Sequence, residues 1–231
     1  MARSPLLGNG SAGQKVAAVA LVVVITLLVG GSILYSALRD TTPGENSAEA
    51  GFLRDMQVHH TQAVIMADTI RFRTEDDQIM AMATDIAFAQ MSQVGTMSGF
   101  LQLWDLNPTG DERAMAWMGH PTTGLMPGMA TDEEIDQLQT LPVEEAEVLF
   151  LQLMNRHHFA GVEMAEAVLE RSDQEDVALL AEGMMRVQDA EIEVMNILLT
   201  QRGEEPVTTV DAEIHAGAEP AATPTDEDHD H

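Results

Sequence analysis

The chain has 231 residues, no cysteine and a formal net charge of −27 at pH 7. The absence of cysteine excludes disulfides, thiolate metal sites and cysteine nucleophiles. A surface this acidic repels nucleic acid, so we expect no nucleic-acid partner, whereas cations would be attracted.

The first predicted element is an apolar segment at residues 16–38, which contains no charged residue. At ~1.5 Å per residue, a helix of this length spans roughly 35 Å, enough to cross a bilayer core. Arg3 and Lys15 precede the segment, and the two charges that follow it nearly cancel. The positive-inside rule therefore predicts a single-pass cell-membrane anchor, with residues 1–15 in the cytoplasm and the rest of the chain extracytoplasmic.

A cleaved signal peptide is the alternative for this segment, and it would produce a secreted protein. Gly30 and Ser32 are small residues of the kind found at a cleavage site. Because the apolar run continues to Leu38, we favour the uncleaved anchor.

A polar spacer at residues 39–47 leads to the main domain, which we predict at residues 48–203. Its first part, residues 48–104, has apolar residues three or four positions apart, which is typical of amphipathic helices. We expect one helix at about 47–72 and a second that ends near 104. Thr74 and the three acidic residues after it predict the N-terminus of the second helix.

Residues 105–141 form a connection in which the helical pattern weakens. A connection this long in a compact domain usually crosses the fold or carries function. Thr131 and Glu134 have the spacing of a capping box and predict one short helix. The connection is rich in potential soft-metal ligands, namely Met115, Met118, His120, Met126 and Met129.

The last part of the main domain, residues 142–203, again predicts two helices. Pro142 suits a first helical turn, and Ser172 and Glu175 have capping-box spacing before the second helix. Residues 204–231 are acidic and poor in apolar side chains, so we expect a disordered tail.

The two helical pairs are copies of each other. Matching residues lie at a constant offset of 98 positions, as from His59 to His157. The copied residues are Phe52, Met56, His59, His60, Met66 and Ala67, which recur as Phe150, Met154, His157, His158, Met164 and Ala165.

The sequence therefore predicts an all-α protein: a ferritin-like four-helix bundle from a duplicated helical hairpin, preceded by one transmembrane helix. An up-down bundle with an elaborate loop is the alternative. A pseudo-two-fold axis would bring the two His-His pairs towards each other.

The repeated residues are candidate metal ligands. On a helix, Met56 lies one turn before both His59 and His60, and Met66 follows near the edge of the same stripe. Thioether and imidazole groups together suit Cu(I), while imidazole also suits zinc, copper(II) and nickel. Two glutamines amid the apolar stripes of the partner helices, Gln90 and Gln188, would hydrogen-bond the rings and fix their tautomers.

A purely structural interpretation competes with this one. Methionine commonly fills irregular helical cores, and a single histidine on an apolar face is more often a core residue than a ligand. For the connection, the alternatives are exposed methionines that capture Cu(I), and methionines that pack over the bundle. We expect no enzyme: a di-iron centre in such a bundle needs Glu-x-x-His, which occurs nowhere in the chain.

The pattern Phe-x-x-x-Met-x-x-His-His-x-x-Ala/Gly-x-x-Met-Ala, found in both repeats, resembles the bacterial family called domain of unknown function 305. So do the later Gln-x-x-Glu and the central Gly-Leu-Met-Pro-Gly-Met-Ala-Thr. The resemblance implies a ferritin-like bundle, usually exported or membrane-anchored, and copper handling, since a periplasmic copper-binding protein belongs to the family. The implied ligands are Met56, His59, His60, Met66, Met126, Met129, Met154, His157, His158 and Met164.

One position departs from the family pattern. Gln-x-x-Glu is intact at Gln188 and Glu191 but reads Gln90 and Gln93 in the first repeat. If the glutamate supports a ligand, the first half of the site is weaker. We thus predict a membrane-anchored, extracytoplasmic protein that binds a copper ion for sequestration or resistance. The alternative is an envelope interaction or scaffold module whose histidines are core residues; the sequence leaves a homo-oligomer open.

Overall fold

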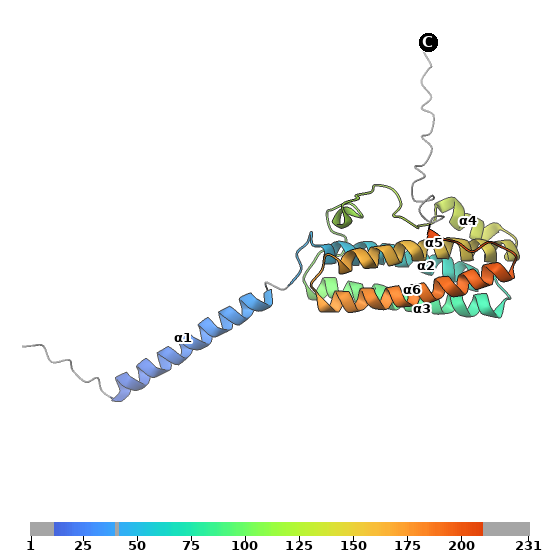
Figure 1. Ribbon diagram of the computed structural model, residues 1–231. Helices are drawn as coiled ribbons and strands as arrows, with labels where there is room; N and C mark the ends of the chain where they lie inside the picture. The colour runs from blue at the N-terminus through green and yellow to red at the C-terminus, as the bar shows by residue number, and fades with distance from the viewer. Residues whose placement is uncertain (1–11, 40–41, 210–231) are drawn as a thin grey trace, which may run out of the picture. The chain divides into compact units, whose positions relative to one another are not determined.

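The computed structural model describes residues 12–39 and 42–209, and the regular elements in these ranges are all helices (Figure 1). The all-helical prediction is therefore confirmed. The chain divides into two compact units, Met1–Thr42 and Pro43–His231. Residues 1–11 and 210–231, which include most of the predicted N-terminal segment and acidic tail, lie outside the described residues.

The first unit contains helix α1, Ala12–Arg39. Its segment Ala12–Ser36 has a mean hydropathy of 2.7 and is long enough to cross a membrane. A signal sequence near an N-terminus has the same character, so the helix is a candidate anchor or signal segment.

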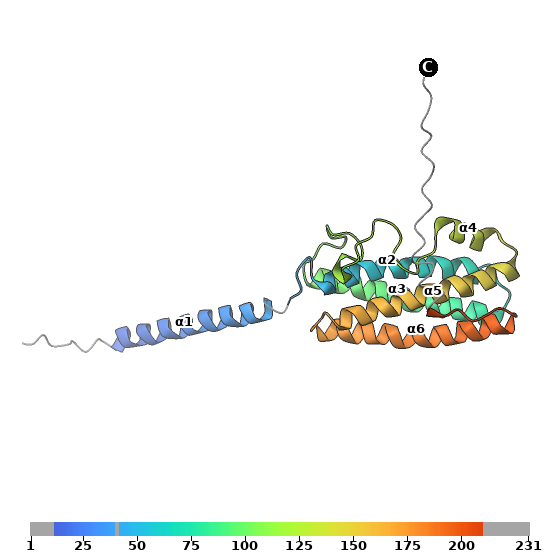
Figure 2. The same cartoon turned by 45° about the horizontal axis from the view of Figure 1, so that its top comes forward.

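The second unit is built from four long helices that lie side by side (Figures 1 and 2). They are α2 (Ala48–Arg71), α3 (Asp77–Leu103), α5 (Val143–Leu169) and α6 (Glu175–Gln201). Within each repeat the two helices pack closely, α2 on α3 and α5 on α6, and α2 also packs on α5. By contrast, α3 and α6 contact each other only sparsely. The seam between α2 and α5 therefore joins the two repeats.

The connection between the repeats crosses the length of the bundle, from the end of α3 to the start of α5 at the opposite end (Figures 1 and 2). It contains a 3₁₀ turn, η1 (Ala116–Met118), and the short helix α4 (Asp132–Thr140). The turn packs on α2, and α4 packs on both α2 and α5.

The helix ends follow the predicted caps in part. The capping box of Thr131 and Glu134 is present at α4. The predicted box at Ser172 and Glu175 is wrong, because α6 begins after Gln174 and Ser172 accepts a hydrogen bond from the Gln174 N–H instead.

The predicted cap of the second helix also differs. The N-cap of α3 is Asp76, whose carboxylate accepts from Gln78 and Ile79. Thr74 instead donates its hydroxyl to the buried carboxylate of Glu147, at 2.5 Å. The side-chain oxygen of Thr74 thus links the two repeats rather than starting a helix.

The connection is fastened to α2 by a buried carboxylate. Asp55 accepts hydrogen bonds from the Met115 N–H at 2.7 Å and from the Trp117 indole N–H at 2.9 Å. The Trp117 ring meets Phe52 edge-on, and it lies so close to α2 that a Cβ at Gly51 would be 2.5 Å from it. Burial raises the pKa of the Asp55 carboxyl despite these donors. Because any side chain at residue 51 would overlap the Trp117 ring, glycine is required there for the turn to dock on α2.

We predict that Gly51→Ala displaces Trp117 and lowers the free energy of unfolding by about 1–3 kcal/mol, because the added methyl group overlaps the indole. Urea unfolding and tryptophan fluorescence would measure both effects. Gly95→Ala on α3 is the matched control: nothing lies within 4 Å of its new methyl, so it should stabilise the helix by about 0.5–1 kcal/mol. Equal effects of the two changes would contradict the docking argument.

Candidate metal site

The two repeats meet at a stacked pair of histidines. The rings of His59 on α2 and His157 on α5 lie 3.6 Å apart between centroids, with planes inclined by 29°. Both side chains are fully buried. His157 donates its Nε2–H to the backbone carbonyl of His59 at 3.0 Å. The expectation that the repeat brings the two His-His pairs together is confirmed.

The second histidine of each pair is held by a residue of the neighbouring helix. His60 donates Nε2–H to the side-chain oxygen of Gln93 on α3, and His158 donates Nε2–H to Glu191 on α6, both at 2.7 Å. These two acceptors occupy matching positions in the repeats. In three of the four rings, an oxygen thus fixes the proton on Nε2, which leaves Nδ1 as the lone-pair nitrogen of the neutral imidazole.

The predicted roles of Gln90 and Gln188 are not realised. Gln90 is 3% exposed, yet neither atom of its amide has a hydrogen-bond partner, and the Oε1 of Gln188 has none. Gln188 does approach α5 closely, since a Cβ at Gly161 would lie 2.4 Å from its Oε1. The residues that hold the rings lie three positions further along each helix, and only the Glu191 position was indicated by the sequence.

The centre of the bundle contains many buried polar atoms without partners. The Nδ1 atoms of all four histidines are among them, together with His59 Nε2. A buried polar group left unpaired costs about 1–3 kcal/mol, so such groups in a native protein call for an explanation. Lone pairs gathered in one buried layer are the arrangement expected at a site that receives a ligand.

Burial keeps three of these histidines, His59, His60 and His157, uncharged. It lowers the pKa of His59 to about 3 and that of His60 to about 4, although Gln93 favours the protonated form of His60. The pKa of His157 also falls well below its usual value, through burial first and then through the nearby histidines. Metal-binding imidazoles must be deprotonated, so these three rings already have the required charge state.

His59, His60, His157 and His158 together form the histidine layer. The motif methionines are buried on both sides of this layer. Met56 belongs to the same apolar cluster as Met164 of the other repeat, whereas Met66 belongs to the same cluster as Met154. Each cluster thus combines a thioether that precedes one His-His pair with a thioether that follows the other. The sulfur atoms come from both repeats, as the pseudo-two-fold relation requires.

The connection closes over the histidines along α5. Gly128 has a φ of +75°, and a Cβ there would lie 2.8 Å from the Arg156 carbonyl and 3.2 Å from the His157 Cα. Gln62 on α2 binds the backbone of Ala130 twice, at 2.8 and 2.7 Å. Arg156 binds both carboxylate oxygens of Glu134, at 3.0 and 2.7 Å. Sequence reasoning missed these clamps, because only the fold brings their partners together.

The methionines of the connection pack over the bundle, which corrects the prediction of exposed capture ligands. Met115 and Met126 are buried at 3% and 4% exposure, and Met118 and Met129 are partly buried against the Met56 cluster. His120 is exposed and belongs to neither cluster. Only Met126 and Met129 flank the segment that covers the histidines.

The described residues contain no group of three or more histidine, aspartate or glutamate side chains arranged to hold a metal ion. The two central rings are stacked face to face. A metal in this layer would therefore need thioether ligands as well as imidazole, and some rotation of the rings. The donor set, uncharged imidazole and thioether, fits a soft cation of low charge.

Comparisons with known proteins agree with this fold. The family described as "Domain of unknown function (DUF305)" matches residues 49–199. A DUF305 protein of Streptomyces coelicolor, described as secreted, is 45% identical over 71% of this chain and 99% of its own, with a TM-score of 0.68. A DUF305 fragment from Deinococcus radiodurans is 31% identical over 67% and 96%, with a TM-score of 0.56.

The fold also matches that of CopM in its Cu(I)-bound form, at 22% identity and a TM-score of 0.50, over 67% of this chain and 96% of that one. The Cu(II)-bound form of CopM matches at 23% identity and a TM-score of 0.53, over 67% and 97%. The comparison with curated proteins found no match.

We predict that the metal-free protein loses stability as the pH falls from about 6.5. The pKa values of His59 and His60 are lowered to about 3 and about 4, so below pH 6.5 the unfolded state binds more protons than the folded state. His59, His60 and His157, whose pKa values are lowered, should each cost about 1 kcal/mol of unfolding free energy between pH 6.5 and 5.5. Urea unfolding at the two pH values would measure the loss.

The double change His59→Leu with His157→Leu is the comparison for this prediction. It removes two of the groups that resist protonation, so the loss between pH 6.5 and 5.5 should be smaller by about 2 kcal/mol. An unchanged loss would show that the stacked pair does not control the pH dependence.

Proposed function

This chain belongs to the DUF305 family, and we propose that its helical bundle binds copper as Cu(I) through the repeated histidines and methionines. The observation that carries the proposal is the protonation pattern of the rings. His60, His157 and His158 each donate Nε2–H to an oxygen, and each keeps an unpartnered Nδ1. Metal-binding histidines in proteins have this arrangement, with the second nitrogen held by a carbonyl or carboxylate.

Cu(I) is the metal that suits the surrounding atoms best. Thioether ligands are soft and select Cu(I), and the neutral imidazoles of His59, His60 and His157 add no charge to the buried layer. Magnesium and calcium would require several oxygen ligands, whereas Glu191 is the only carboxylate that binds a histidine in the described part of the chain. CopM, which shares the fold, has been solved with Cu(I) and with Cu(II), and this supports testing copper first.

We assign the site to sequestration or resistance rather than to catalysis. A buried ion enclosed by thioether and imidazole groups is protected from solvent, and storage requires no catalytic residue. We also infer a ferritin-like arrangement of the four helices. Two helical hairpins and a connection that runs the length of the bundle support that inference.

We further propose that α1 is an uncleaved anchor that holds the bundle on the extracytoplasmic side of the cell membrane. The support is its apolar length, with a mean hydropathy of 2.7 over Ala12–Ser36, and the positive charges at its N-terminal end, Arg3 before the helix and Lys15 in its first turns. On the outer side of the membrane, the bundle would meet copper ions before they enter the cell.

The competing function is an envelope interaction module whose histidines are core residues. The observation in its favour is that the described histidine and acidic side chains make no ready group of three ligands. The two functions differ in one measurable property, which is the affinity of the folded protein for Cu(I).

We predict that replacing Met56, Met66, Met154 and Met164 by leucine lowers the Cu(I) affinity by at least ~100-fold, because loss of direct ligands should exceed the 10–100-fold effects of outer-shell changes. Leucine conserves volume, so the core should persist. The affinity would be measured anaerobically against a competing Cu(I) chelator. Met97→Leu with Met195→Leu is the control, since both residues are fully buried and copied at the repeat offset but lie on α3 and α6, which do not carry the paired histidines.

Bound Cu(I) should also raise the free energy of unfolding of the unchanged protein. A ligand that binds only the folded state at 100 times its dissociation constant adds about 2.7 kcal/mol. If neither the unchanged protein nor the control pair binds Cu(I), the copper proposal fails and the envelope module is favoured.

We predict that the expressed protein stays in the membrane fraction at its full mass, because the apolar helix is long enough to span the bilayer. Fractionation followed by intact-mass spectrometry would test this. A soluble product that lacks the first ~30 residues would instead identify α1 as a cleaved signal peptide.

A further inference from the structure

The histidine layer is closed on one side of the bundle and approachable on another. Along the α2–α5 seam, the segment that contains Gly128 lies directly on the backbone of α5 beside His157. Gln62 and Arg156 hold that segment in place through hydrogen bonds to Ala130 and Glu134. A cation could reach the rings from this side only if these clamps opened.

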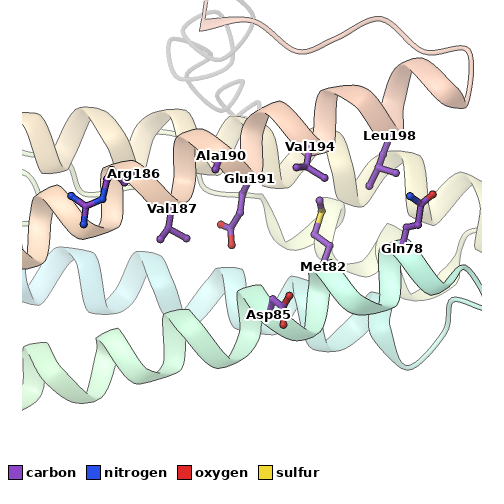
Figure 3. A pocket seen from close by; sticks show the side chains of 9 residues that line it. All are labelled: Gln78, Met82, Asp85, Arg186, Val187, Ala190, Glu191, Val194 and Leu198. Atoms are coloured by element: carbon purple, nitrogen blue, oxygen red, sulfur yellow. The ribbon is translucent and has the colours of Figure 1, made fainter.

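A groove of about 480 Å³ lies between α3 and α6, where the two helices make only sparse contact (Figure 3). Its walls are mostly apolar, with Val187, Val194 and Leu198 on α6. Carboxylates come from Glu191 on α6 and Asp85 on α3, Met82 adds a thioether, and Arg186 on α6 adds one positive charge. Figure 3 shows Glu191 and Met82 extending into the space between the helices.

Glu191 connects this groove to the buried histidines. Its carboxylate lines the groove and is 18% exposed, while its Oε2 accepts the Nε2–H of His158, whose side chain is fully buried, at 2.7 Å. The Nδ1 of His158 has no hydrogen-bond partner of its own. One side chain therefore touches both the groove and the candidate metal site.

We propose that the α3–α6 groove is the entrance by which a soft monovalent cation reaches the histidine layer, with Glu191 as the residue that receives it. This inference rests on the proposed function, since it concerns the filling of the same site. The two carboxylates of Glu191 and Asp85 outnumber the single guanidinium of Arg186 in the groove, so its net negative charge attracts the cation. The thioether of Met82 provides a soft ligand as water is removed.

The two repeats differ at this point, which makes the entrance one-sided. The residue that matches Glu191 in the first repeat is the uncharged Gln93, and the residue that matches Asp85 in the second repeat is Gly183. The acidic pair therefore occurs once, on the side of His158. If the cation enters at one place only, the acidic residues are needed in one copy of the repeat and not in the other, as is observed here.

The test separates the rate of metal loading from the amount bound. Val194→Phe fills the groove, because Val194 is 45% exposed and lines it. Val58→Phe is the matched control on α2: Val58 is 57% exposed, adjacent to His59 and outside the groove. Glu191→Gln removes the receiving charge and keeps a hydrogen-bond acceptor for His158. The full-length chain in detergent would be used for all four proteins, including the unchanged one.

Each protein would be mixed anaerobically with Cu(I), and then with Ag(I), in a stopped-flow instrument, and loading followed by ultraviolet charge-transfer absorption. We expect Val194→Phe and Glu191→Gln to slow loading by at least ~10-fold, within the range of electrostatic and access effects on association. Val58→Phe should load at the unchanged rate. In a separate equilibrium titration, Val194→Phe should bind as much Cu(I) as the unchanged protein.

The outcomes distinguish the two proposals. If the unchanged protein binds Cu(I) but all variants load equally fast, the groove is not the entrance and the metal site stands. If Val58→Phe alone slows loading, the cation enters along α2 and the inference is overturned. If no protein binds Cu(I) at equilibrium, the proposed function itself fails. Far-ultraviolet circular dichroism of each variant would exclude misfolding as the cause of slow loading.

Discussion

The contact on which the bundle depends is the pair of stacked histidines between α2 and α5. His157 donates a hydrogen bond to the backbone of His59, so an imidazole ring takes the place of an apolar side chain at the junction of the repeats. Burial keeps both rings uncharged, as the lowered pKa values show. A pair of apolar side chains would pack at this junction at a lower cost in free energy. A pair of histidines is expected here only if their nitrogen lone pairs bind a ligand.

The unpartnered nitrogens of the histidine layer lower the free energy of unfolding of the metal-free protein. Leaving buried polar atoms without hydrogen bonds reduces stability, and the two apolar clusters on either side must offset that loss. A bound cation would satisfy several of these atoms at once, so binding and stability are coupled at one place. The clamps formed by Gln62 and Arg156 hold the covering segment against α5 without help from a metal.

Sequence duplication has produced a site that is symmetric in its histidines and asymmetric in their supports. Each outer ring finds its acceptor on the neighbouring helix of its own repeat, but one acceptor is the neutral Gln93 and the other the acidic Glu191. The connection adds a second asymmetry, because it covers the layer along one face only. The open groove between α3 and α6 lies beside the acidic half. The acidic acceptor Glu191 and the groove thus lie on the same side of the site, next to His158.

The sequence by itself determined the helices and the repeat, and it predicted that the two His-His pairs would meet, because these follow from local periodicity and from residues copied at a fixed offset. It also indicated the Thr131 cap at α4. It could not identify Gln93 as the partner of His60, or show that Met115 and Met126 are buried, since such contacts join residues far apart in the chain. The role assigned to Gln90 failed because periodicity gives the face of a helix but not the height at which a neighbouring ring meets it. Only the tertiary structure decided which side chain reaches each nitrogen, since hydrogen bonding depends on distances of a few tenths of an ångström.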